Sequence, residues 1–399
     1  MRPAVLLCLA VLAPAGEAAG LRRDWTGLVP AWEAKDLVQG DAAVNGSPSG
    51  VTVVGDTVVA LGRGDGKDLV FAFAVADGKK LWQQEYPAPA EKTWKGLGNG
   101  PRAAPVIEGE RVITLGAYGH LTCWALKTGE RQWQVQVRDD SKTKVPYWGV
   151  CGTPAVFAGL VLVKPGGYEQ GPKAPIVLAY RLEDGKPAWR SVEGSGSWAP
   201  LRVQRIDGKD QVLAWHGSGL KALDPADGKQ LWDIPWKTAY DCHASLPAVE
   251  GAVLFLSSGY GAGCQAFELR AGRPEPLWER SKAVSACNAD PVITGGHVYA
   301  FSGNGMKGSL KCLELRTGAE KWSSPDFGNG SLALVDGLLF CQGYGGVIGL
   351  VEAAPAACSK LAQLKVFEVK DPPAYAPPVV AGGRAFLRYM NRLVCFDLR

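Results

Sequence analysis

The segment Ala222-Leu-Asp-Pro-Ala-Asp-Gly-Lys-Gln-Leu-Trp232 decides the fold, because variants of it recur along the chain. It combines the end of one β-strand, a turn that favours glycine, and the start of a second strand that carries a tryptophan. Regular copies surround Gly78, Gly129, Gly185 and Gly318. Self-similarity at a period of several tens of residues indicates stacked supersecondary units, so we expect a repeat architecture rather than two or three unrelated domains.

Hairpins that precede these segments give a second, independent count of the repeat. Each hairpin is two β-rich runs joined at a glycine turn, a pattern typical of antiparallel strands. The eight turns follow one another at intervals of 42 to 54 residues and lie at Gly55, Gly109, Gly159, Gly208, Gly251, Gly295, Gly337 and Gly382. A copy lengthened by two residues ends at Trp278, and a degenerate copy from Leu350 to Leu364 has lost its tryptophan.

The two ends of the chain complement each other. The C-terminal run Leu393-Val-Cys-Phe-Asp-Leu-Arg399 matches the strand before the glycine turn and then stops, whereas Trp32 has no hairpin before it. Joining them completes an eighth blade and removes the exposed edge of an open array. The sequence therefore predicts an all-β fold: one eight-bladed β-propeller over residues 20–399, with four-stranded antiparallel blades and both termini in the last blade.

The repeated tryptophan is expected to fill the space between neighbouring blades while its indole N–H donates to a backbone carbonyl. Ten residues before each regular tryptophan lies a small side chain, either alanine or cysteine, and Cys395 takes this place in the closing blade. Cysteine acts as a small hydrophobic residue in such a niche. The tryptophans expected to dock blade against blade are Trp32, Trp82, Trp133, Trp189, Trp232, Trp278 and Trp322.

This tryptophan-docking unit resembles that of the pyrroloquinoline-quinone (PQQ) propeller superfamily. The resemblance covers nearly all of residues 20–399. The superfamily includes quinoprotein alcohol dehydrogenases, the non-catalytic propeller of the outer-membrane barrel-assembly machinery, and single-propeller envelope proteins called PQQ-binding-like. In length and regularity the chain is most similar to the last group.

The N-terminus predicts export. Arg2 precedes the apolar stretch Ala4–Ala15, and small residues near Ala19 offer a cleavage site, so residues 1–19 are expected to be a signal peptide and the protein to lie in the periplasm or cell envelope. That stretch is too short to span a bilayer, and no other is long and apolar enough. With a net charge of +4, the chain gives no electrostatic reason to bind nucleic acid. We expect a monomer.

The segments that enter the first strand of each blade line one mouth of a propeller, and here they concentrate aromatic and polar side chains. They favour a concave binding site for a small ligand or an envelope protein. Alternatively, these side chains only fill the opening that eight blades leave. The candidate binding residues are Arg102, Trp148, Trp198, His243, Asn288 and Asp290.

Cysteines also fall in three mouth segments, at Cys151, Cys242 and Cys287. An exported chain permits a disulfide, and the pair Cys242 and Cys287 is the candidate. Unpaired buried thiols are the alternative, and an odd number of cysteines remains once Cys8 is removed with the signal peptide. Zinc or copper would suit thiols and an imidazole, but there is no Cys-x-x-Cys pair, so no metal site is predicted.

Two functions follow from these observations. The favoured interpretation is a non-catalytic binding or scaffold module. The alternative is a minimal PQQ-dependent alcohol or sugar dehydrogenase with Ca²⁺. Quinoprotein dehydrogenases resemble one another in a pair of adjacent cysteines, carboxylate and amide ligands for calcium, and an aspartate base. This sequence has no Cys-Cys pair. Asp241, Asn288 and Asp290 lack calcium-loop spacing. No catalytic residue is therefore assigned.

Overall fold

The computed structural model describes residues 20–39, 47–91, 93, 98–166, 174–206, 208–335, 337–369 and 373–399. The predicted signal peptide, residues 1–19, lies outside these ranges. The contacts divide the described chain into two compact units. The first unit is Leu37–His243, and the second combines residues 20–36 with Ala244–Arg399. A single domain over residues 20–399 stays a prediction.

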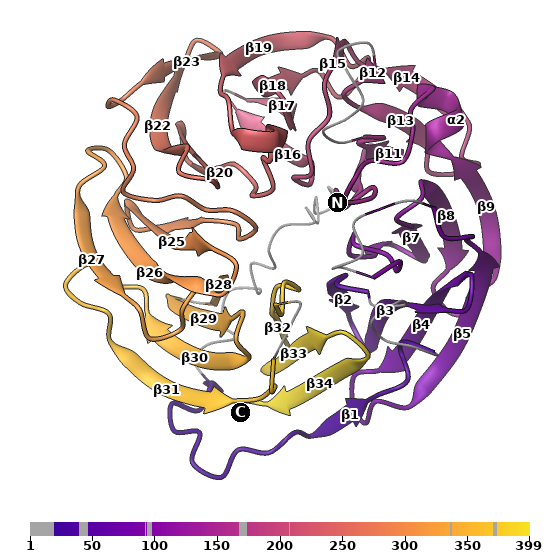
Figure 1. Cartoon of the computed structure of the whole chain (residues 1–399), viewed down its shortest axis with the longest axis horizontal. Helices are drawn as coiled ribbons and strands as arrows, with labels where there is room; N and C mark the ends of the chain where they lie inside the picture. The colour runs from indigo at the N-terminus through magenta and orange to yellow at the C-terminus, as the bar shows by residue number, and fades with distance from the viewer. Residues whose placement is uncertain are drawn as a thin grey trace. The chain divides into compact units, whose positions relative to one another are not determined.

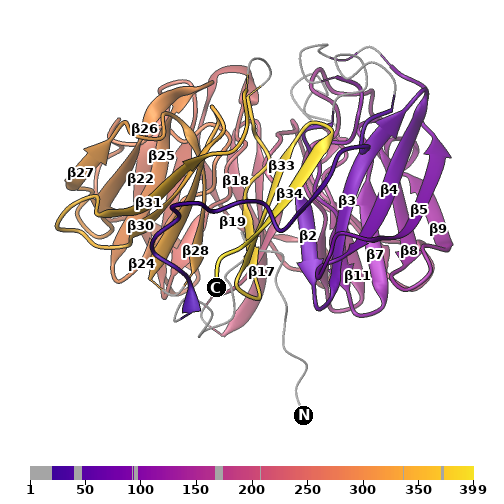
Figure 2. The same ribbon diagram turned by 90° about the horizontal axis from the view of Figure 1, so that it is seen from below.

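Four antiparallel sheets of four strands make up the first unit, and they follow the chain from indigo to rose in Figure 1. In each sheet the strands pair in sequence order, as the hairpin pattern predicts. The strands are β2 (Val51–Val54), β3 (Thr57–Gly64), β4 (Lys67–Ala74) and β5 (Lys80–Pro87); β6 (Val106–Glu108), β7 (Arg111–Leu115), β8 (His120–Ala125) and β9 (Arg131–Gln136); β10 (Ala155–Phe157), β11 (Leu160–Val163), β13 (Leu178–Arg181) and β14 (Pro187–Arg190); β16 (Arg202–Ile206), β17 (Lys209–His216), β18 (Gly219–Leu223) and β19 (Gln230–Pro235). Figure 2 shows β2 to β5 side by side in this order.

Four further sheets of the same kind make up the second unit, up to the yellow C-terminal strands of Figure 1. Their strands are β20 (Ala248–Glu250), β21 (Val253–Ser258), β22 (Gly263–Arg270) and β23 (Arg273–Pro276); β24 (Val292–Thr294), β25 (His297–Asn304), β26 (Lys307–Glu314) and β27 (Glu320–Ser324); β28 (Gly330–Val335), β29 (Leu338–Gly343), β30 (Val347–Glu352) and β31 (Lys360–Lys365); β32 (Val379–Ala381), β33 (Arg384–Tyr389), β34 (Arg392–Asp397) and β1 (Trp32–Ala34). The fold is thus an eight-bladed β-propeller of four-stranded antiparallel blades, as predicted.

The last sheet confirms that both termini share one blade. Strand β1 pairs antiparallel with β34, so Trp32 lies opposite Cys395. The N-terminal residues Leu21, Trp25 and Leu28 are buried in the same hydrophobic cluster as β33 and β34. Ordering the N-terminal segment therefore covers the edge that β34 would otherwise expose.

Little else interrupts the sheets in the described part of the chain. A short helix, α2 (Val137–Ser141), follows β9, and a 3₁₀ turn, η4 (Ala239–Asp241), follows β19. Strands β12 (Ala174–Pro175) and β15 (Glu193–Gly194) form an additional two-stranded ribbon. None of the described helices has the length and apolar character needed to cross a bilayer.

The cross-strand register explains why a small residue precedes each tryptophan by ten positions. The two residues face each other on the third and fourth strands: Ala72 and Trp82, Cys123 and Trp133, Ala179 and Trp189, Ala222 and Trp232, and Cys312 and Trp322. The degenerate copy exchanges the two sizes, since Leu350 lies opposite Ala362. A large and a small side chain therefore occupy this pair of positions in either order.

Five indole N–H groups donate to a backbone carbonyl of the following sheet, at 2.8 to 3.1 Å. The donors are Trp82, Trp133, Trp189, Trp278 and Trp322, and the acceptors are Leu126, Leu182, Pro225, Leu315 and Ala354. Trp232 differs, because its Nε1 donates to Oε1 of Gln211 in its own sheet at 2.8 Å. The hydrophobic clusters likewise draw their residues from two successive sheets, so the core lies between the blades.

Candidate functional site

The predicted binding residues all lie in segments that precede the first strand of a sheet. Arg102, Trp148, Trp198 and His243 belong to the first unit. Asn288 and Asp290 belong to the second unit and precede β24. The structure brings Trp148 and Trp198 into direct contact and links Arg102 to the same segment.

An aromatic cluster forms where three mouth segments of the first unit meet. It consists of Tyr147, Trp148, Trp198 and Tyr240, and Trp148 contacts the other three. The ring centroids of Trp148 and Trp198 lie 4.6 Å apart at an interplanar angle of 73°. Tyr147 and Tyr240 also meet Trp148 edge to face, at 5.5 and 6.5 Å. Edge-to-face contacts are among the favourable geometries for aromatic rings.

Two tyrosines expose the cluster to solvent. The exposed fraction is 45% for Tyr147 and 55% for Tyr240, while Trp198 is buried, with 6% exposed. Both tyrosines lie in segments that precede the first strand of a sheet, and neither was among the binding residues predicted from the sequence. Their exposure was the missing information, because an aromatic side chain in a loop is as compatible with packing as with display.

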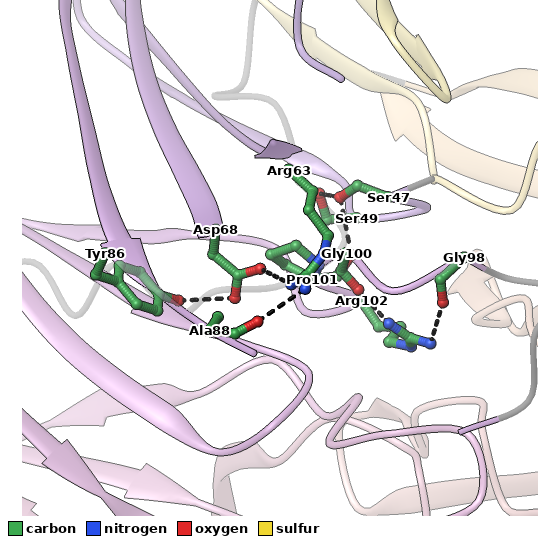
Figure 3. Close-up of polar contacts among 10 residues, drawn as sticks. All are labelled: Ser47, Ser49, Arg63, Asp68, Tyr86, Ala88, Gly98, Gly100, Pro101 and Arg102. Atoms are coloured by element: carbon green, nitrogen blue, oxygen red, sulfur yellow. Dashed lines mark hydrogen bonds and ion pairs between the residues drawn. The ribbon is translucent and has the colours of Figure 1, made fainter. Parts of the chain in front are cut away.

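Arg102 holds the backbone beneath the aromatic cluster. Its Nε donates to the Trp148 carbonyl at 2.8 Å, and its Nη2 donates to the Gly98 carbonyl at 2.8 Å. Its Nη1 donates to the Gly100 carbonyl (Figure 3). The side chain is only 9% exposed. The guanidinium, predicted as a ligand contact, thus binds three carbonyls of the chain and positions Trp148.

A buried ion pair lies in the first blade of the same unit. Nη1 of Arg63 lies 2.8 Å from Oδ1 of Asp68, and Nη2 donates to the Ala88 carbonyl at 2.7 Å. Tyr86 donates its hydroxyl to Oδ2 of Asp68 at 3.1 Å (Figure 3). Burial outweighs the opposing effects of Arg63 and Tyr86 and raises the pKa of Asp68 to about 6. The pair joins β3 to β4 and the end of β5.

The backbone that displays Tyr240 has an unusual conformation. Tyr240 and Asp241 both have left-handed φ angles, 60° and 50°. Such angles cost a non-glycine residue of the order of 1 kcal/mol and persist only where the surroundings enforce them. Gly217 provides the room, since a Cβ there would lie 2.3 Å from Oδ2 of Asp241. The local fold is therefore set to project Tyr240 outward.

His243 holds the backbone of Trp198 through its carbonyl and packs on Trp215 through its ring. Its ring is buried and stacks on Trp215, with centroids 4.5 Å apart and an interplanar angle of 3°. Its Nδ1 lies 3.2 Å from the Thr238 hydroxyl. Its carbonyl accepts the N–H groups of Trp198 and Ala199, at 3.2 and 2.7 Å. These contacts make His243 a positioning residue for Trp198.

Asn288 and Asp290 hold segments of the second unit. The Tyr344 hydroxyl donates to the Asn288 carbonyl at 3.0 Å, and Oδ1 of Asp290 accepts the Leu246 N–H at 2.7 Å. A ligand role for either residue stays a prediction.

The mouth cysteines are thiols in this structure. Cys242 is buried in the first unit and Cys287 in the second. The disulfide expected between them is not formed here and stays a prediction for the oxidised protein. Among the described residues, no group of three or more histidine, cysteine or acidic side chains is arranged to hold a metal ion.

An anionic quinone such as PQQ requires cationic donors for its carboxylates. Two cationic side chains near the cluster already bind the chain itself. Lys164, which is 2% exposed, donates to the Ser197 hydroxyl at 2.7 Å and to the Ala199 carbonyl at 3.1 Å. Arg102 is occupied in the same way. These two side chains are therefore not available as donors to PQQ, whereas Lys237, which acts on Asp241, is exposed.

Comparison with curated proteins finds sequence similarity over about half of the chain. It is 27% identical over 199 residues to quinohemoprotein alcohol dehydrogenase ADH-IIG of Pseudomonas putida, which covers 49% of this chain and 25% of that protein. It is 29% identical over 205 residues to serine/threonine-protein kinase AfsK of Streptomyces coelicolor, covering 50% and 21%. The chain thus spans about a quarter or less of the length of these relatives.

Solved structures match the fold at low identity. BamB from Moraxella catarrhalis superimposes with a TM-score of 0.65 and 15% identity, covering 93% of this chain and 98% of that one. Quinohemoprotein alcohol dehydrogenase from Comamonas testosteroni gives a TM-score of 0.66 and 14% identity, covering 97% and 78%. The family described as outer membrane protein assembly factor BamB matches residues 18–147 and 66–324. The chain therefore belongs to this BamB-type family of PQQ-like propellers.

Proposed function

We propose that the chain is a non-catalytic binding module of the cell envelope, and that its aromatic cluster contacts a protein partner. The main support is that two exposed tyrosines belong to segments whose backbone is held in place by the rest of the chain. Arg102 holds the Trp148 carbonyl, and the left-handed pair at Tyr240 and Asp241 fixes the neighbouring turn. Tyrosine and tryptophan are the residues most enriched at binding hot spots.

Rigidity of the cluster supports this role. A binding surface that is already ordered loses less conformational entropy when a partner docks. The edge-to-face contacts of Trp148 with three rings restrict each side chain before binding. Each exposed tyrosine also keeps a hydroxyl at the rim, where it can exchange water for a partner's polar group.

An envelope location rests on two supports. Residues 1–19 have the charge, apolar stretch and small residues of an export signal. The family to which the chain belongs is described as an outer membrane assembly factor. We further propose that the exported protein is a monomer.

The alternative function is a PQQ-dependent dehydrogenase, which the similarity to quinohemoprotein alcohol dehydrogenase ADH-IIG favours over about half of the chain. The occupied donors Arg102 and Lys164 count against it. Fold kinship by itself carries little weight for chemistry.

Site-specific crosslinking in the envelope of the producing cell tests the proposal. A photoreactive amino acid replaces Tyr147 or Tyr240, and a control variant carries it at Leu231, an exposed position on β19 of the same unit. We expect one defined protein adduct from both tyrosine positions and none from the control. Absence of any adduct, or the same adducts at all three positions, would contradict a partner at the cluster.

A dye-reduction assay tests the catalytic alternative on the same protein. Purified protein is incubated with PQQ and Ca²⁺ and then offered alcohols and aldose sugars. We expect no substrate-dependent reduction of the dye. Turnover that depends on both PQQ and Ca²⁺ would replace the binding module with the dehydrogenase.

A further inference from the structure

Buried polar side chains occupy the same second-strand position in several blades, so their surroundings can be compared from blade to blade. In each blade, one second-strand residue lies opposite the third-strand residue that pairs with the docking tryptophan or its substitute. The position compared here lies two residues further along the second strand. The pairs that define it are Leu162 with Ala179, Phe255 with Ala266, Phe340 with Leu350, and Phe386 with Cys395. This position is apolar in four blades, where it is Leu61, Leu115, Trp215 and Phe301, and polar in the other four, where it is Lys164, Ser257, Gln342 and Arg388.

Three of these four side chains find partners in the segment that enters the next sheet. Lys164 donates to Ser197 and Ala199. Ser257 accepts the N–H of Ala286 at 3.0 Å. Nε2 of Gln342 donates to the carbonyls of Ala374 and Ala376 at 3.4 and 3.0 Å. Where this position is polar, the chain therefore supplies a hydrogen-bond partner in three of the four blades.

Arg388 breaks this pattern. It is 1% exposed, yet among the described residues neither Nη1 nor Nη2 has a hydrogen-bond partner. Among the described residues no carboxylate forms an ion pair with it. Burial lowers the pKa of Arg388 to about 9, which still leaves the guanidinium charged at neutral pH. A buried charge without a counter-charge is strongly unfavourable, so this guanidinium calls for an acceptor beyond those that the described residues supply.

The turn after β33 fixes how Arg388 is oriented. Nε donates to the Met390 carbonyl at 2.7 Å, and Met390 has a left-handed φ of 52°. Because the Met390 carbonyl accepts the hydrogen bond of Nε, the two Nη groups can both donate to a single ligand. Strain that orients an unsatisfied charged group is typical of binding sites.

We propose that Arg388 anchors a binding site for a small free carboxylate, whose two oxygens each accept a hydrogen bond from one Nη group. A planar carboxylate matches the guanidinium fork, and its single negative charge balances the single cation. The near-complete burial of Arg388 favours a molecule of the size of formate or acetate over the end of a peptide. The site lies in the second unit and does not depend on the function proposed for the aromatic cluster.

Thermal unfolding of the whole protein with and without sodium acetate tests the site. The variants are Arg388→Met, which keeps the length of the side chain without its charge, and Arg388→Lys, which keeps the charge without the fork. The control is Arg205→Met, which removes an exposed guanidinium from β16 and reports the general response to salt. Sodium bromide provides a monoanion that cannot bind with two oxygens.

We expect acetate to raise the Tm of the wild-type protein and of Arg205→Met along a saturating curve. A concentration of 100 times Kd corresponds to a roughly 100-fold larger ratio of folded to unfolded protein. Arg388→Met should not respond and should be at least as stable as the wild type without acetate, because it removes an unpaired buried charge. Arg388→Lys should respond weakly and no longer prefer acetate over bromide.

Several outcomes would overturn the site. The first is that acetate raises the Tm of Arg388→Met as much as that of the wild type. The second is that bromide raises the Tm of the wild type as much as acetate does. Crystals grown in acetate give a second measurement that does not require any variant to fold. We expect planar density within hydrogen-bond distance of Nη1 and Nη2, and separate water molecules there would refute the proposal.

Discussion

The indole of Trp82 lies against Gly129 of the following sheet. A Cβ on Gly129 would come within 2.7 Å of the Trp82 ring, and Nε1 of Trp82 donates to the Leu126 carbonyl three residues earlier. The same relationship joins Trp133 to Gly185, Trp189 to Gly228, and Trp278 to Gly318. The glycine of each of these repeats thus serves two purposes: it adopts a positive φ in its own turn and leaves room for the tryptophan of the repeat before it.

Replacing Gly129 with alanine should therefore destabilise the protein more than an ordinary turn substitution. Gly129 combines a φ of +73° with the close approach of Trp82, whereas Gly109 has a φ of +55° and open space around its missing Cβ. We expect Gly109→Ala to cost about 1 kcal/mol of the free energy of unfolding. Gly129→Ala should cost ~2–4 kcal/mol, since it adds overpacking to the strain. Urea unfolding measures both, and equal losses would argue against the contact.

Truncation of Trp232 should reveal the packing contribution of the repeated tryptophan. The side chain is 7% exposed and lies opposite Ala222. Trp232→Ala should lower the free energy of unfolding by ~3–5 kcal/mol, as large-to-small changes in a core do. Trp232→Phe keeps most of the volume but leaves Oε1 of Gln211 without its donor, which should cost ~1–3 kcal/mol. A loss below 1 kcal/mol for the alanine variant would contradict a docking role.

Protonation of Asp68 should make stability depend on pH. Burial raises its pKa from 3.8 to about 6 in the folded protein, so the folded state binds this proton more tightly than the unfolded state. The stabilising contribution is complete below about pH 4 and is lost as the pH rises through 6, by ~3 kcal/mol. Asp68→Asn does not titrate and provides the reference. The difference in unfolding free energy between the wild type and this variant should fall from pH 4 to pH 6, and the opposite slope would mean that Arg63 dominates.

Replacing Arg102 with lysine keeps the positive charge but should make the segment that carries Tyr147 and Trp148 less rigid. A lysine cannot reach the three carbonyls of Gly98, Gly100 and Trp148 together. Arg102→Lys should lose hydrogen bonds worth ~1.5–3 kcal/mol, which corresponds to roughly 10- to 100-fold faster hydrogen–deuterium exchange in residues 146–152. Arg205→Lys, at an exposed position, is the control. Unchanged exchange in both variants would show that Arg102 does not hold this segment.

Removing the N-terminal strand should expose the edge of the last sheet. A protein that begins at residue 37 lacks β1 together with Leu21, Trp25 and Leu28 of the core. We expect a loss of at least ~3 kcal/mol and self-association through β34. Light scattering and urea unfolding compare it with a protein that begins at residue 20. Trp32→Ala, which keeps the strand, should lose stability without associating.

The sequence could define the candidate site only as a set of segments. It placed Trp148 and Trp198 in segments that precede the first strands of neighbouring blades, and in the structure their rings are in contact. It could not separate Arg102 and His243, which support the cluster, from Tyr147 and Tyr240, which are exposed. That distinction depends on which carbonyls lie near each side chain, and these carbonyls come from segments far apart in the chain.

By itself the sequence determined the eight repeats, the strand order within each blade, and the blade shared by the two termini. Alternating apolar residues and glycine turns are local properties that the chain carries wherever it folds. Only the tertiary structure decided that Gly129 receives Trp82, that Asp68 is paired within the first blade, and that Arg388 lacks an acceptor. Burial and hydrogen bonding between distant segments set these features, so no local pattern records them.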